Sequence, residues 1–280
     1  MKTLIVSTEE LAAHPEWRVF DCRAELTDPD AGPRAYAAGH IPGALHAHLE
    51  LDLSGAKTGR NGRHPLPRAE DFIRWLGRTG LRAEDQVVAY DSAGTSYAAR
   101  LWWLLQWVGH RAVAVLDGGF DKWMREGRPV TRDVPSFVST VYSATPDDSL
   151  WIDSDQVLRD LDTRERLMVD ARGAGRYAGI GETIDPVAGH IPGARNRPYT
   201  DNLAADGSFK PAHVLRRELE AIIAGYRPSQ VVNLCGSGVT ACHNILAMNI
   251  AGLDGGLLYP GSWSEWISDP SRAIATGSKP

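Results

Sequence analysis

Residues 231–240, VVNLCGSGVT, predict a buried strand, a tight glycine-bearing loop and the start of a helix. Cys235 comes first in the loop, so we expect it at the carboxyl end of the strand, facing the amino end of the helix. Backbone N–H groups and the helix dipole favour an anion at such a position. Because the thiolate is the nucleophilic form of cysteine, Cys235 is the candidate nucleophile of the chain.

The second half of the chain repeats the first. The segment AGHIPGA at residues 38–44 recurs at residues 188–194, and an Asp-x-Arg triplet precedes each copy. The period is close to half the chain, which is too long for a solenoid and predicts two copies of one domain. In register, Asp91 lies opposite Cys235, so the first copy keeps a similar loop at residues 91–96 without the nucleophile.

Short runs of β-branched residues alternate with helical stretches in both halves. In the first half, residues 87–90 and 113–116 are predicted strands, and residues 96–108 between them are a predicted helix. The second half repeats the pattern, with a strand at residues 167–169 and a helix at about residues 239–251. This alternation predicts an α/β fold in which each half is a mostly parallel sheet flanked by helices. Ligands of such sheets bind beyond the carboxyl ends of the strands.

Proline and irregular polar sequence mark the boundary between the halves, at Pro129, Pro135 and Pro146. We therefore expect a first domain at residues 1–135, a linker at residues 136–149 and a second domain at residues 150–280. A further irregular stretch, residues 54–67, holds three glycines and the basic residues Arg60, Arg63 and His64. Loops of this length in compact domains are often functional.

Composition narrows the class of protein. The 280 residues carry a net charge of -5 without a basic run, so we expect neither nucleic acid nor a membrane as a partner. Three irregularly spaced cysteines give no disulfide framework, and no apolar run reaches membrane-spanning length. We expect a soluble cytoplasmic protein without a cofactor. No metal is expected, because Cys235, Cys242 and His243 lack the spacing of zinc ligands.

Other roles for Cys235 fit the residues less well. A buried, inert cysteine is the simplest alternative, but a glycine-rich loop at a strand end argues against it. A cysteine phosphatase or arsenate reductase would need an oxyanion-binding arginine six positions later, where this chain has Ala241. A dithiol redox site would need a second cysteine at the position of Gly238.

The chain resembles the tandem-domain rhodanese family of sulfurtransferases nearly from end to end. The loop at residues 235–240 is similar to that of the 3-mercaptopyruvate sulfurtransferases, whereas thiosulfate-preferring members carry basic residues at its second and third positions. Further matches are the two GHIPGA segments, DAR at residues 170–172, GRY at residues 175–177 and LDGG at residues 116–119. The resemblance implies two rhodanese-like domains, the first catalytically inactive and the second catalytic.

The resemblance also implies a two-step reaction. A small anionic donor, 3-mercaptopyruvate or thiosulfate, gives its sulfane sulfur to Cys235 and leaves a persulfide. A thiol or cyanide then takes the sulfur, and a thioredoxin-like protein is one thiol that would serve as acceptor. The alternative from another class is a non-catalytic persulfide carrier or interaction module, which would be loaded by a partner and would turn over no small donor.

Five loop residues after Cys235 are candidates for holding the anion. The N–H groups of a short loop can converge on one centre, and Gly236 and Gly238 permit the backbone conformations that this requires. Ser237 adds a hydroxyl next to the nucleophile. Val239 and Thr240 open the helix, where Thr240 either supports the site or caps the helix.

By resemblance, the donor's anionic group is bound by Arg176, and a histidine that corresponds to His64 acts with Ser237. Such a pair would polarise the donor or shuttle a proton. Two positions depart from the mercaptopyruvate pattern. Asp185 stands where a second substrate arginine is usual, and His48 stands where an aspartate usually completes the Ser237–His64 pair.

Overall fold

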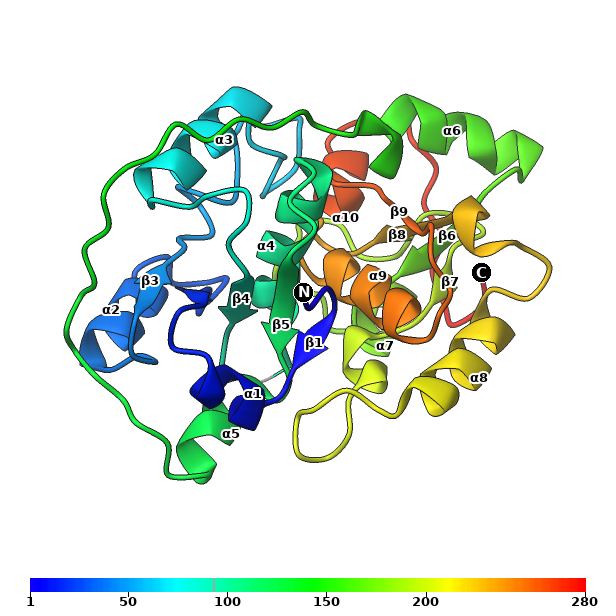
Figure 1. The fold of residues 1–280 in the computed structure, drawn as a ribbon. Helices are drawn as coiled ribbons and strands as arrows, with labels where there is room; N and C mark the ends of the chain where they lie inside the picture. Colours follow the sequence, from blue (N-terminus) through cyan, green and yellow to red (C-terminus); the bar gives the residue numbers. More distant parts are fainter. Residues whose placement is uncertain (93) are drawn as a thin grey trace. The chain divides into compact units, whose positions relative to one another are not determined.

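The computed structural model describes residues 1–92 and 94–280 (Figure 1). Its internal contacts divide the chain into two compact units, each built on one parallel sheet. The first unit comprises Met1–Gly55, Pro67–Asp147 and Ala204–Phe209, and the second comprises Ala56–Leu66, Asp148–Leu203 and Lys210–Pro280. The loop segment Ala56–Leu66, which contains His64, therefore belongs to the second unit.

The sheet of the first unit has the strand order β1-β5-β4-β2-β3, and its described pairings are all parallel. Its strands are β1 (Ile5–Val6), β2 (Arg18–Asp21), β3 (Ala44–His46), β4 (Val87–Tyr90) and β5 (Val113–Leu116). Its helices are α1 (Thr8–Ala13), α2 (Ala31–Ala38), α3 (Ala69–Arg78), α4 (Ser96–Trp107) and α5 (Gly119–Arg125). The central strand β4 and its neighbour β5 are buried along their whole length.

The sheet of the second unit has the order β7-β6-β8-β9 and is again parallel. Its strands are β6 (Leu167–Asp170), β7 (Arg195–Asn196), β8 (Val231–Leu234) and β9 (Leu257–Leu258). Its helices are α6 (Ser154–Thr163), α7 (Ala174–Ala178), α8 (Ala212–Ile222), α9 (Thr240–Ile250) and α10 (Ser262–Trp266), with 3-10 turns at η1 (Asp148–Leu150), η2 (Tyr199–Asn202) and η3 (Pro228–Gln230). A single parallel bridge from Trp151 to Leu258 takes the place that β1 has in the first sheet.

The predicted α/β fold, with a mostly parallel sheet flanked by helices in each half, is confirmed. The predicted strands at 87–90, 113–116, 167–169 and 231–234 all form, and the predicted helices correspond to α4 and α9. The short strands β1, β7 and β9, of two residues each, and β3, of three residues, were not predicted from the sequence. A strand this short shows no period in the sequence, so only its pairing with a longer neighbour defines it.

The repeated GHIPGA segment has the same structural role in both units. His40 stacks on Tyr36 with ring centroids 3.9 Å apart, and His190 stacks on Tyr177 at 3.8 Å. In each unit the histidine Nδ1 hydrogen-bonds the backbone carbonyl of that tyrosine, at 2.9 Å. These rings are buried in the core of each unit, so the repeated motif stabilises the fold and lies outside the catalytic chemistry.

The Asp-x-Arg triplet is also structural. Arg172 pairs with Asp170 through Nη2 at 2.7 Å and donates to the carbonyl of Gly189 at 2.8 Å. Arg23 pairs with Asp21 in the same way in the first unit, at 2.5 Å. Both arginines are buried, so each is held by the carboxylate that its charge needs in a medium of low dielectric. The repeated triplet therefore forms the same buried ion pair in both units.

Candidate active site

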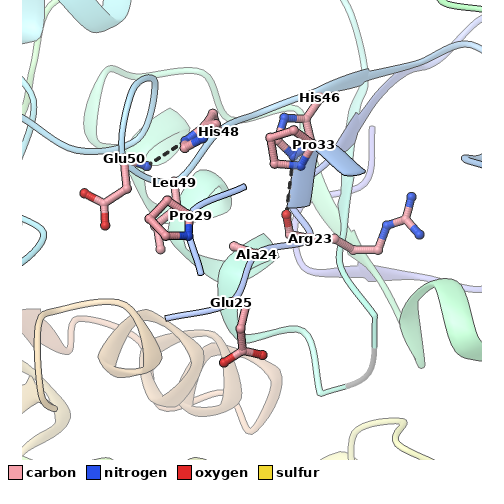
Figure 2. Close-up of a pocket in the computed structure, with 9 residues that line it drawn as sticks. All are labelled: Arg23, Ala24, Glu25, Pro29, Pro33, His46, His48, Leu49 and Glu50. Carbon is pink, nitrogen blue, oxygen red and sulfur yellow. Dashed lines mark hydrogen bonds between the residues drawn. The ribbon is translucent and has the colours of Figure 1, made fainter. Parts of the chain in front are cut away.

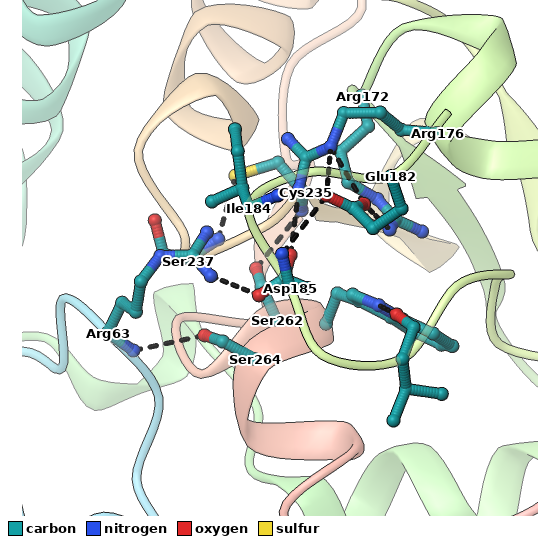
Figure 3. A network of polar contacts seen from close by, with 12 residues as sticks. Arg63, Arg172, Arg176, Glu182, Ile184, Asp185, Cys235, Ser237, Ser262 and Ser264 are labelled. Atoms are coloured by element: carbon teal, nitrogen blue, oxygen red, sulfur yellow. Dashed lines mark hydrogen bonds and ion pairs between the residues drawn. The ribbon is translucent and has the colours of Figure 1, made fainter. Parts of the chain in front are cut away.

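Cys235 follows the last residue of β8 and precedes α9 by a loop of four residues (Figure 3). Its side chain is buried, with 2% of the residue exposed. The N–H of Gly238 points at the sulfur from 3.1 Å, and the N–H of Ser237 points at it from 3.4 Å. Two backbone donors next to a helix amino end are placed where they could stabilise negative charge on that sulfur.

The start of α10 holds this loop in place. The Cys235 N–H donates to the Ser262 hydroxyl at 3.0 Å, and the Trp263 N–H donates to the Cys235 carbonyl, also at 3.0 Å. The Ser264 N–H donates to the carbonyl of Gly236 at 2.9 Å. The loop therefore keeps its shape before any ligand arrives, which is the preorganisation that anion stabilisation needs.

Glycine is required at position 238. Its φ is +77°, in the left-handed region, and a Cβ there would lie 2.3 Å from the carbonyl oxygen of Pro260. Val239 is buried at the N-cap of α9, and Thr240 is half-buried as the first helical residue. The hydrogen bonds described for the sulfur come from residues 237 and 238, so Val239 and Thr240 lie in the loop–helix junction beyond them.

The structure brings His64 and Ser237 together. The His64 Nδ1 lies 2.7 Å from the Ser237 hydroxyl, and both side chains are buried. Ser237 also donates its N–H to the Cys235 sulfur, so this one residue contacts both the imidazole and the candidate nucleophile. This arrangement could move a proton between His64 and a group bound at the sulfur.

Four charged side chains form an ionic group beside the loop (Figure 3). Arg176 donates from Nε to both oxygens of Glu182, at 3.1 and 2.8 Å, and from Nη2 to Asp185 at 2.7 Å. Arg63 pairs with the other oxygen of the same Asp185. Both carboxylates are almost fully buried, whereas the Arg176 and Arg63 side chains are 22% and 28% exposed. Burial alone would raise the pKa of Glu182, but hydrogen bonds from Arg176 and from two backbone N–H groups outweigh it and lower the pKa.

Both guanidinium groups reach the residue after the nucleophile. A Cβ placed on Gly236 would lie 2.9 Å from Nη2 of Arg63 and 3.6 and 3.7 Å from the two Nη atoms of Arg176. From the sequence, Arg63 is a basic residue of an irregular loop with no predicted role at the site. Its position directly before His64 was the signal that could have identified it.

His48 lies in the first unit, in a pocket at the carboxyl ends of β2 and β3 (Figure 2). Its N–H donates to Asp52 at 2.8 Å, and its Nδ1 accepts the N–H of Glu50 at 3.1 Å. The nine lining residues are Arg23, Ala24, Glu25, Pro29, Pro33, His46, His48, Leu49 and Glu50. Burial raises the pKa of Asp52.

Asp91 takes the place in the first sheet that Cys235 takes in the second. The register pairs Asp21 with Tyr90 and Asp170 with Leu234, so Asp91 and Cys235 each follow the equivalent strand. The Asp91 carboxylate accepts the N–H groups of Tyr97 and Ala98 at the start of α4, at 2.7 and 3.1 Å, and burial raises its pKa to about 7. Position 93 of this predicted loop lies outside the described residues.

Two further features are absent from the described residues, a metal-binding cluster and a membrane-spanning helix. Among residues 1–92 and 94–280, no group of three or more His, Cys, Asp or Glu side chains could hold a metal ion. Within the same residues, the helices are too short or too polar to cross a membrane.

Comparison with known proteins gives consistent matches. The family model for the rhodanese-like domain matches residues 7–126 and again residues 153–269. A probable 3-mercaptopyruvate sulfurtransferase of Pseudomonas aeruginosa is 45% identical over 278 residues, which is 98% of both chains. A thiosulfate sulfurtransferase of Bos taurus is 34% identical over 98% of this chain and 95% of its own. The solved structure of a 3-mercaptopyruvate sulfurtransferase from Leishmania major is 32% identical with a TM-score of 0.84, over 94% of this chain and 74% of that one.

Proposed function

Since this chain belongs to the rhodanese family, we propose that it is a sulfurtransferase that carries sulfane sulfur on Cys235. The observation that supports this most directly is the pair of N–H groups, of Ser237 and Gly238, that point at the Cys235 sulfur. They would stabilise a negative sulfur both before and after transfer, as a thiolate and as a persulfide. The donor is 3-mercaptopyruvate or thiosulfate, the two donors that the names of similar proteins give.

The first step breaks one bond to sulfur and forms another. The Cys235 thiolate attacks the outer sulfur of thiosulfate, the S–S bond of the donor breaks, and sulfite leaves with the electron pair. With 3-mercaptopyruvate the C–S bond breaks and the enolate of pyruvate leaves. The thiol proton of the donor then passes to the enolate carbon, which gives pyruvate and the persulfide anion. The Ser237–His64 pair stands where it could relay that proton.

The second step returns the enzyme to its starting state. A thiolate or cyanide attacks the outer sulfur of the persulfide, and the Cys235 thiolate leaves with the electron pair. The products are a new persulfide or thiocyanate. A thioredoxin-like protein would serve as a protein acceptor, and a cytoplasmic location would keep its thiols and Cys235 reduced.

The two copies have different roles in this proposal. Residues 150–280 form the catalytic domain, with Arg176, Gly236, Gly238, Val239 and Thr240 as residues that bind the donor or shape its site. His64 joins them from the loop segment Ala56–Leu66, which belongs to the same unit. Residues 1–135 form an inactive domain, because Asp91 offers a carboxylate where the second copy offers a thiol. Residues 136–149 link them.

Steady-state transfer to cyanide from 3-mercaptopyruvate and from thiosulfate, measured side by side, tests this function. We expect turnover with at least one donor, one extra sulfur on Cys235 by intact mass, and complete loss of both in Cys235→Ser. The matched control is Cys22→Ala, since Cys22 is also buried and the second copy has Ala171 at its place. Turnover in Cys235→Ser, or no turnover of either donor by the unchanged protein, contradicts the proposal.

A further inference from the structure

Arg176 by itself is poorly suited to attract an anionic donor. Its guanidinium faces two carboxylates, those of Glu182 and Asp185, so its single positive charge is exceeded by their two negative charges. The neighbouring Arg172 also lies 3.8 Å from Glu182, but the negative charge of Asp170, its nearer partner, cancels its own positive charge. With these five residues alone, the site has a net charge of -1 and would repel the donor.

Arg63 changes that balance. Its guanidinium pairs with the second oxygen of Asp185, which brings the charge of the six residues to zero. The arginine is fixed at both ends, because its backbone N–H donates to the Ser264 hydroxyl at 3.0 Å (Figure 3). Asp185 therefore holds two arginines at once, one on each oxygen.

The head groups of the two arginines meet beside the nucleophile. Both lie within 4 Å of a Cβ placed on Gly236, the residue that follows Cys235, and Nη2 of Arg63 is the nearer, at 2.9 Å. The Nε of Arg63 is buried and, among the described residues, has no hydrogen-bond partner. This N–H can still donate a hydrogen bond, and an oxyanion bound beside Gly236 would accept it.

We propose that Arg63 is a donor-binding residue, which with Arg176 forms a two-arginine site for the oxyanion of the sulfur donor. Asp185 is the positioning residue that aligns both guanidinium groups. This inference rests on the proposed sulfurtransferase function and deepens it. The oxyanion is the carboxylate of 3-mercaptopyruvate or the sulfonate end of thiosulfate, and both offer several acceptor oxygens to a planar guanidinium.

The experiment compares Arg63→Ala and Arg63→Gln with Arg176→Ala and with the control Arg60→Ala. Arg60 is an exposed arginine of the same loop, so its removal changes the loop charge equally. We expect KM for the active donor to rise about tenfold or more in each Arg63 variant, as for the loss of one charge-assisted hydrogen bond, with kcat within about threefold. Arg60→Ala should keep KM within about twofold.

Inhibition by the anionic products separates the two donors. Pyruvate carries the carboxylate and sulfite carries the sulfur oxyanion, so the product whose Ki rises in Arg63→Gln identifies the group that Arg63 binds. A rise of about tenfold in at least one Ki is expected. The glutamine variant keeps a hydrogen-bond donor toward Asp185. It is therefore the variant that decides the result if Arg63→Ala unfolds at a lower temperature than the unchanged protein.

Unchanged KM and Ki values in Arg63→Gln would overturn the inference, and so would an equal rise in Arg60→Ala. Failure of the proposed function has a different signature. If the unchanged protein turned over neither donor, calorimetric binding of sulfite and pyruvate to the unchanged and Arg63→Gln proteins would still decide whether Arg63 binds an oxyanion.

Discussion

Replacing Gly238 by alanine should damage both the stability of the second unit and its activity. The backbone of Gly238 has a φ of +77°, and a left-handed conformation costs an alanine about 1 to 2 kcal/mol. The new Cβ would also lie 2.3 Å from the Pro260 carbonyl oxygen, a backbone atom, so the loop must shift. We therefore expect the free energy of unfolding to fall by about 2 to 4 kcal/mol in all.

The same shift acts on the chemistry. Gly238 donates its N–H to the Cys235 sulfur at 3.1 Å, and a hydrogen bond to a charged group is worth about 1.5 to 3 kcal/mol. If that hydrogen bond serves the transition state, its loss lowers kcat by a factor of about 10 to 100, since each 1.36 kcal/mol corresponds to a tenfold change in rate. The assay is steady-state transfer to cyanide at a temperature where the variant is folded, alongside urea unfolding.

Gly193→Ala is the matched control. Gly193 has nearly the same φ, +80°, but it is exposed and a Cβ there would meet nothing within 4 Å. This variant should lose only about 1 to 2 kcal/mol of stability and keep its kcat. If Gly238→Ala lost no more stability than the control and kept its kcat, the argument that this loop is tightly fitted and supports the sulfur anion would be refuted.

The remaining predictions concern the buried carboxyl of Asp91 and the buried pair of Ser237 and His64. Because burial raises the pKa of Asp91 to about 7, the folded protein holds this proton more tightly than the unfolded chain, and stability is lost as pH rises from about 4 toward 7. The difference in free energy of unfolding between Asp91→Asn and the unchanged protein should therefore favour the variant by about 2 to 3 kcal/mol more at pH 8 than at pH 5, as measured by urea unfolding. An equal difference at both pH values would contradict the reasoning. Ser237→Ala and His64→Asn should each lower kcat/KM about 10- to 100-fold, and the double variant should lose little more than either alone; losses that multiply would mean that the two side chains act separately.

Local sequence predicted the parts of the molecule that depend on local chemistry. Apolar runs of four residues predicted β4 and β5, and the largely apolar run VVNL predicted β8, because strands buried on both faces need nearly continuous apolar sequence. The glycine-bearing loop after β8 predicted that Cys235 faces a helix amino end, because a strand, a short loop and a helix follow one another there. The internal repeat predicted that Asp91 takes the place of Cys235, because two copies of one fold share one register.

Pairs that are distant in the sequence could not be found in this way. The resemblance to the family suggested the contact between His64 and Ser237, which are 173 positions apart, but no pattern in the residues predicted it. From the sequence, Asp185 is a departure from the mercaptopyruvate pattern, because a second substrate arginine is usual at its position. In the structure it pairs with Arg63, 122 positions away, as well as with Arg176.

The sequence by itself thus determined the duplicated α/β fold, the candidate nucleophile and the copy that lacks it. Each of these depends on the order of residues within a strand, a loop and a helix. The charge balance beside the nucleophile was decided only by the tertiary structure. Whether Asp185 opposes an anionic donor or aligns two arginines depends on where the loop that carries Arg63 packs, and ion-pair energies follow distance and burial in space, which spacing along the chain does not specify.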